Sequence, residues 1–160
     1  MDTDLLLTQL VEALDRDLEL IRVIRYRLTV LSALAAADQG PWLPGAIDEM
    51  AAATAALHSA EQDRAQVTGE VARAFGLPPA TRIEALAVPV GGAWGDVLLE
   101  RRRALTEAVT GVQGLAATVS GVMGRRASLA EEALAFLGGD GNATYGRTQG
   151  RGALLVEGAI

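Results

Sequence analysis

The 160-residue sequence contains no cysteine and only one histidine, His58, and all 14 of its basic residues are arginine. Without cysteine there are no disulfide bonds and no thiolate metal sites. Without lysine there is no phosphate-loop lysine and no Schiff-base chemistry. Aromatic residues make up 4% of the chain, although 50% of it is hydrophobic. A core of mainly aliphatic side chains is typical of helical bundles, so we predict an all-α protein.

The charge balance is acidic, with a formal net charge of -6 at pH 7. Proteins that neutralise nucleic-acid phosphates are basic on at least one face. The densest basic run, Arg101-Arg102-Arg103, is flanked by Glu100 and Glu107. We therefore expect no nucleic-acid partner.

No segment has the pattern of a secretory signal or a membrane span. The first residues, MDTDLLLTQL, begin with acids, whereas a signal peptide begins with basic residues. The uncharged segment 108–124 has 17 residues, at the lower limit for spanning a bilayer, and it carries four glycines and several polar residues. We expect a cytoplasmic protein without membrane insertion.

Apolar residues recur at steps of three and four over residues 3–37, 42–76 and 93–137, which predicts three long helices. Thr3 is the expected N-cap of the first helix, and Asp17 is expected to fall off its apolar stripe. Gly40-Pro41 and Gly76 are typical helix stops, and short connections imply antiparallel neighbours. The predicted fold is an antiparallel bundle of three long helices and one short helix over residues 1–137, followed by a flexible glycine-rich tail over residues 138–160.

The predicted short helix lies between the second and third long helices. Thr81-Arg82-Ile83-Glu84 has the pattern of a capping box, in which the threonine hydroxyl and the glutamate satisfy each other's backbone amides. The helix would cover "RIEALA" and close at Pro89, and Gly91-Gly92 would form a hinge before the last helix.

The last predicted helix is rich in both aliphatic residues and glycines. At about 1.5 Å per residue it would be roughly 65 Å long, so part of it would extend beyond one core or meet a partner. Gly111, Gly114, Gly121 and Gly124 each cost about 1 kcal/mol relative to alanine. Two hypotheses follow: tight packing within the chain, or a groove for a helical cargo that orders when it is filled. The apolar stripe of this helix includes Leu105, Val109, Val112, Ala116, Val119 and Met123.

No residue pattern predicts catalysis, a metal site or a cofactor. His58 is interpreted as a solvated or capping side chain on a helix. The adjacent acids Asp48-Glu49 and Glu131-Glu132 do not share a helix face, so they do not form a carboxylate pair. Asn142-Ala143-Thr144 matches the N-glycosylation acceptor, which we attribute to chance in a chain without a signal peptide. The protein is expected not to be an enzyme.

The order and spacing of these features resemble the FlgN family of flagellar export chaperones. The resemblance covers nearly the whole chain, and its most specific marks are Gly76-Leu77-Pro78 with the short helix after it, and Thr144-Tyr145-Gly146 beyond the last helix. Two details depart from the family pattern: the last helix lacks an N-x-x-N pattern, and Gly150 comes one position late for YGxxG.

The resemblance implies a small cytoplasmic helical chaperone. It implies that the last long helix binds the C-terminal helices of hook-associated proteins, which build the hook–filament junction. The cargo-binding residues would then be those of its apolar stripe, Leu105, Val109, Val112, Ala116, Val119 and Met123. It implies that the chaperone prevents their premature assembly and delivers them to the flagellar type III export gate. It also implies that Tyr145 docks on the cytoplasmic domain of that gate.

Two alternatives stay open. The first is a secreted WxG-like helical protein, although Trp94-Gly95 has no intervening residue and Gln149 stands where an acid is expected. The second is a coiled-coil scaffold that self-associates through the same stripes. Association as a homodimer and the identity of the preferred hook-associated protein are also open.

Overall fold

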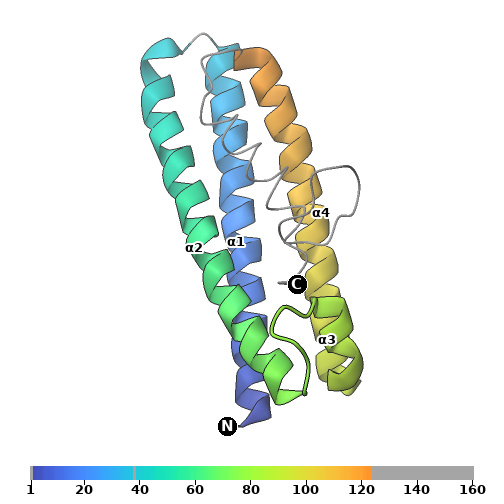
Figure 1. Cartoon of the computed structure of the whole chain (residues 1–160). Helices are drawn as coiled ribbons and strands as arrows, with labels where there is room; N and C mark the ends of the chain where they lie inside the picture. Colours follow the sequence, from blue (N-terminus) through green and yellow to red (C-terminus); the bar gives the residue numbers. More distant parts are fainter. Residues whose placement is uncertain (1, 38, 124–160) are drawn as a thin grey trace.

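The chain is all-α: three long helices and one short helix pack together (Figure 1). The computed structural model describes residues 2–37 and 39–123. The elements are α1 (Thr3–Ala36), the 3-10 turn η1 (Gly40–Trp42), α2 (Leu43–Ala74), α3 (Ile83–Val90) and α4 (Gly92–Met123). The predicted fold class is confirmed. The remainder of the predicted last helix, residues 124–137, and the predicted tail, residues 138–160, lie outside the described residues.

Helix α1 occupies the middle of the molecule. It packs against both α2 and α4, whereas α3 packs against α4 (Figure 1). Helix α2 runs antiparallel to α1, as their short connection predicts, and α4 runs in the same direction as α1. The two outer long helices therefore share α1 as their main packing partner.

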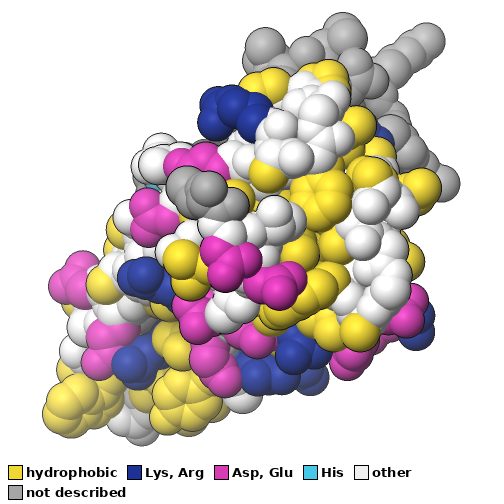
Figure 2. All heavy atoms as spheres, turned by 90° about the horizontal axis from the view of Figure 1, so that it is seen from below, with side chains coloured by type: hydrophobic (Ala, Val, Ile, Leu, Met, Phe, Trp, Pro, Cys, Tyr) yellow, Lys and Arg dark blue, Asp and Glu magenta, His cyan; other side chains and the backbone are white. Residues whose placement is uncertain are grey.

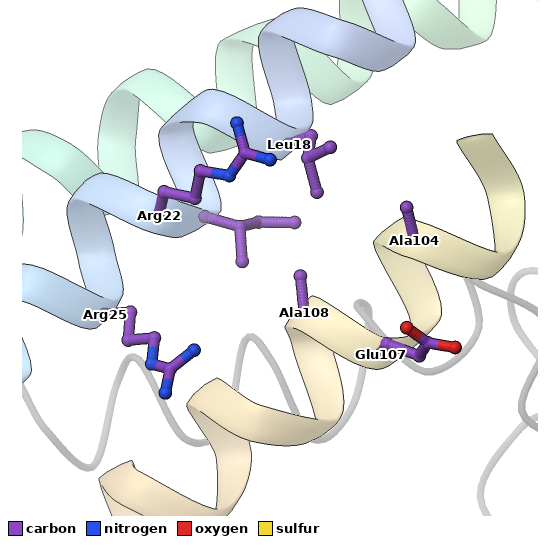
Figure 3. A pocket seen from close by; sticks show the side chains of 7 residues that line it. Leu18, Arg22, Arg25, Ala104, Glu107 and Ala108 are labelled. Carbon is purple, nitrogen blue, oxygen red and sulfur yellow. The ribbon is translucent and has the colours of Figure 1, made fainter. Parts of the chain in front are cut away.

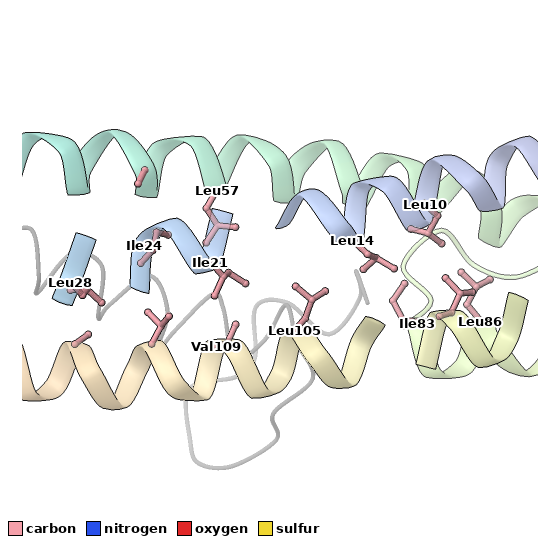
Figure 4. Close-up of a cluster of buried hydrophobic side chains, with 14 of the residues drawn as sticks. Leu10, Leu14, Ile21, Ile24, Leu28, Leu57, Ile83, Leu86, Leu105 and Val109 are labelled. Atoms are coloured by element: carbon pink, nitrogen blue, oxygen red, sulfur yellow. The ribbon is translucent and has the colours of Figure 1, made fainter. Parts of the chain in front are cut away.

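The core consists of aliphatic side chains from all four helices (Figure 4). In its middle, Ile21 of α1 lies near Leu57 of α2 and Val109 of α4. Close to α3, Leu10 of α1 lies near Leu86. Each of these five side chains is at most 2% exposed, so the apolar stripes are used for packing within the chain.

The N-terminus of α1 differs from the prediction by one residue. Asp2, not Thr3, is the N-cap, and its Oδ1 accepts a hydrogen bond from the backbone N–H of Asp4 at 3.1 Å. Aspartate at this position is at least as favourable as threonine, and its negative charge also suits the positive end of the helix dipole.

The end of α2 confirms the predicted glycine stop. Gly76 has φ 71, a left-handed conformation that favours glycine. The N–H of Gly76 donates to the Arg73 carbonyl at 3.0 Å, and the N–H of Leu77 donates to the Ala72 carbonyl at 2.8 Å. These two bonds define a Schellman motif, which satisfies carbonyls at the helix end before the Pro78-Pro79 turn.

The predicted capping box is wrong. Arg82 is the N-cap of α3 and makes no side-chain capping bond. The Thr81 hydroxyl instead donates to the Pro78 carbonyl at 2.6 Å, and the Glu84 carboxylate forms an ion pair with Arg102 of α4. The carbonyl of the preceding proline turn is a local acceptor for the threonine hydroxyl, and the ion pair with α4 holds the glutamate away from the N-terminus of α3. Pro89 lies inside α3 rather than after it.

Candidate functional site

The predicted cargo-binding stripe of α4 forms part of the bundle core. Its members Leu105, Val109, Val112, Ala116 and Val119 are all at most 2% exposed. Met123 is the last helical residue described, and its side chain lies outside the description. The structure thus brings five of the six predicted residues onto one face, and that face belongs to the core that α4 builds with α1. A partner that meets the folded bundle contacts other faces of α4.

The glycines of α4 fall into two groups. A Cβ built on Gly95 would lie 2.8 Å from the Ala87 carbonyl oxygen of α3, so this glycine allows α3 and α4 to approach closely. A Cβ on Gly111, Gly114 or Gly121 would meet nothing within 4 Å. The hypothesis that these three glycines serve tight packing within the chain is therefore wrong for the described structure. Because they carry no side chains, the outer surface of α4 is formed by its backbone at these three positions.

A groove lies between α1 and α4. It encloses about 320 Å³ and is lined by Leu18, Ile21, Arg22, Arg25, Ala104, Glu107 and Ala108. We call it the α1–α4 groove. Figure 3 shows Ala104 and Ala108 pointing from α4 into the space beside Leu18 of α1. The groove exists because α4 presents alanine at two successive turns, where larger side chains would close the space.

The α1–α4 groove has arginines on its α1 wall and a carboxylate on its α4 wall. Arg22 forms an ion pair with Glu19 at 3.0 Å, and both side chains are more than 60% exposed. Arg25 forms no ion pair with any described residue. One turn before the groove, Arg101 bridges to Asp15 at 2.6 Å and ties the two helices together. The groove therefore combines an apolar floor with accessible charge.

Elsewhere the molecular surface is mixed. Seen from below, acidic and basic side chains are interspersed with hydrophobic ones (Figure 2). The most exposed large hydrophobic side chains are Tyr26, Trp42 and Val88, which belong to α1, η1 and α3. Since these three side chains come from different elements, they do not form an apolar face on any one helix.

A buried ion pair lies within the bundle and was missed by the sequence analysis. Arg64 Nε of α2 lies 2.6 Å from Asp17 Oδ2 of α1, and these side chains are 1% and 0% exposed. The prediction that Asp17 falls off the apolar stripe is wrong: it lies between Leu14 and Ile21 on the buried face. Spacing from Leu14 was the available signal, because residues three apart share a helix face.

Burial raises the pKa of Asp17 from its usual 3.8 to about 6, although the nearby Arg64 guanidinium opposes this shift. Glu61 of α2 is also buried, at 8% exposure. The charged residues inside this otherwise aliphatic core are thus gathered on the facing sides of α1 and α2.

The remaining sequence candidates for catalysis and metal binding include His58. His58 is exposed on α2, and its Nε2 lies 3.1 Å from Gln62 Nε2, one turn further along the helix. Among the residues described, no three His, Asp or Glu side chains gather as metal ligands. No described helix combines the length and hydropathy needed to cross a bilayer.

Trp94-Gly95 and Tyr145 are the sequence marks that remain to be located. Trp94 and Gly95 lie in the first turn of α4, and Trp94 packs against the core. Tyr145, the predicted export-gate residue, lies outside the described residues, as does Gly150.

Comparisons of the chain with protein-family models, with curated proteins and with solved structures give no match. The resemblance to the FlgN family therefore rests on the sequence motifs and their order.

Proposed function

We propose that the protein is a flagellar export chaperone of the FlgN type. In this role it binds the C-terminal helices of hook-associated proteins in the cytoplasm and prevents their premature assembly. It then delivers them to the cytoplasmic domain of the type III export gate. The chemistry is binding and release, with no catalytic step.

The observation that carries the proposal is the order of the sequence marks along the chain. A long helical pair is followed by the Gly76-Leu77-Pro78 break, a short helix, a further long helix and then Thr144-Tyr145-Gly146. The geometry of the described part is compatible with such a role, because a three-helix bundle with an open apolar groove can receive an amphipathic helix. The fold-back of α2 on α1 does not favour the alternative of a continuous coiled-coil rod.

Calorimetry between the purified chain and C-terminal segments of hook-associated proteins tests the cargo role. We expect one-to-one binding to at least one segment. Absence of binding to every segment would remove the proposal. Secretion of the protein into the culture medium would favour the WxG-like alternative instead.

Replacement of Tyr145 with alanine tests the gate role. We expect Tyr145→Ala to keep cargo affinity and to reduce binding to the gate's cytoplasmic domain, together with export of the cargo. Tyr145 is the only aromatic residue in the sequence from 138 to 160, so we expect gate binding by this segment to depend on that ring while the helices hold cargo. Equal gate binding by the variant and the original chain would defeat the assignment of Tyr145.

A further inference from the structure

The α1–α4 groove is hollow and apolar along its floor. Leu18 and Ile21 of α1 and Ala104 and Ala108 of α4 line it, and its volume is about 320 Å³. Cavities that bind ligands start at about this size. Since alanine leaves the α4 side low, large side chains of a visiting element can enter between the two helices, as knobs enter holes in helix packing.

The open surface continues along α4 beyond the groove. Gly111 follows Ala108 by three residues, and a Cβ at this position would meet nothing within 4 Å. Residues three and four apart lie on one helix face, so Ala104, Ala108 and Gly111 form a low strip along α4. The Arg101–Asp15 ion pair bounds the strip at its beginning. An elongated occupant such as a helix fits this shape better than a compact small molecule.

The two arginines on the α1 wall determine which sign of charge an occupant can place there. Within the described residues Arg25 has no ion-pair partner, and Arg22 pairs with the exposed Glu19. The chain as a whole is acidic, with a net charge of -6, and the facing α4 wall carries Glu107. An acidic residue of an occupant is therefore attracted to the α1 side of the groove and repelled from the α4 side, which fixes how the occupant is oriented. An acidic residue beside the apolar ridge of a partner helix would be attracted to this position and disfavoured elsewhere.

We propose that the α1–α4 groove is the cargo-docking surface of the folded chaperone, and that it takes an amphipathic cargo helix with an acidic residue beside its apolar ridge. This inference rests on the proposed chaperone function. It places the contact beside the buried stripe of Val109 and Val112 rather than on it. The acidic residue pairs with Arg22 and Arg25, and large apolar side chains occupy the space above Ala104 and Ala108.

The test uses the full chain and the hook-associated segment that it binds in calorimetry. In one variant, Arg22→Glu and Arg25→Glu reverse the wall charge. In a second, Ala108→Phe fills the space. Arg22→Glu and Arg25→Glu are also made singly, and the control matched to each in charge is Arg73→Glu, at an exposed site on α2 away from the groove. Circular dichroism verifies that every variant keeps its helix content.

We expect the double arginine variant to bind the segment at least about tenfold more weakly, and Arg73→Glu to bind normally. Ala108→Phe should also weaken binding at least about tenfold. Changing an acidic residue of the cargo segment to arginine should restore binding to the double variant, which a purely structural effect would not do. Higher salt should weaken the original complex more than the double variant.

Two results would overturn the inference in distinguishable ways. If the original chain binds a segment and all variants bind it equally, the groove is not the docking surface, and the chaperone function stands. If the original chain binds no hook-associated segment, both the function and this docking assignment fall.

Discussion

The Asp17–Arg64 pair places two opposite charges in a core that is mainly aliphatic. Both side chains are almost completely buried and lie 2.6 Å apart. Removing charges from water is costly, and the attraction between them offsets that cost only in part. The raised pKa of Asp17, about 6, expresses this balance: burial dominates over the favourable effect of Arg64.

The shifted pKa predicts a pH dependence of folding stability. The folded chain holds the Asp17 proton more tightly than the unfolded chain, whose carboxyl has the usual pKa of 3.8. The resulting stabilisation is complete below pH 3.8 and is lost as pH rises through about 6. Its full size is on the order of 3 kcal/mol.

The measurement compares thermal unfolding of the original chain and Asp17→Asn between pH 4 and pH 7. We expect the original chain to lose stability relative to the variant as pH rises, because asparagine does not ionise. A difference in melting temperature that stays constant over this range would contradict the pKa shift. The double variant Asp17→Leu with Arg64→Leu should be as insensitive as Asp17→Asn.

Helix α4 shows how one element divides its surface between packing and exposure. Its buried face contains large aliphatic residues, and the crossing with α3 requires Gly95. The outer glycines, such as Gly114, have no neighbour that requires them. The same residue type therefore has opposite consequences at different positions of one helix.

Two alanine substitutions test this division. Gly95→Ala places a methyl group against the Ala87 carbonyl oxygen and should destabilise the fold by about 1–3 kcal/mol. Gly114→Ala should stabilise it by about 1 kcal/mol, because alanine has the higher helix propensity and meets open space. Chemical denaturation measures both. Equal effects of the two substitutions would contradict the described α3–α4 crossing.

The whole bundle depends on α1, which packs against both outer long helices. Ion pairs reinforce this arrangement on both sides: Arg27 of α1 pairs with Glu49 of α2, and Asp15 of α1 pairs with Arg101 of α4. A change that detaches α4 from α1 exposes the shared core, so we expect its effect to spread beyond α4.

The variant Val112→Asp with Val119→Asp tests this dependence. Both valines are 0% exposed, and each substitution buries a carboxylate without a designed partner. Each buried carboxylate costs several kcal/mol, which is a large fraction of the free energy of unfolding of a typical domain. We expect loss of helical ellipticity and of the cooperative thermal transition. Retention of a native-like spectrum would show that α4 does not pack through this stripe.

Local features of the fold were predictable because the interactions that determine them are close in sequence. The 3.6-residue periodicity predicted the helices. The Gly76 stop was also correct, since the left-handed turn and its two hydrogen bonds involve only residues 72–77. The scarcity of aromatic residues in a chain that is 50% hydrophobic correctly indicated an aliphatic helical bundle.

Tertiary packing determined the features that depend on distant side chains. Glu84 does not cap its own helix, because its carboxylate forms an ion pair with Arg102 of α4. Asp17 is buried in the core opposite Arg64, and the apolar stripe of α4 packs against α1. Periodicity identifies an apolar face but does not identify what covers it, because water, a neighbouring helix and a partner protein can all meet the same face until the chain is folded.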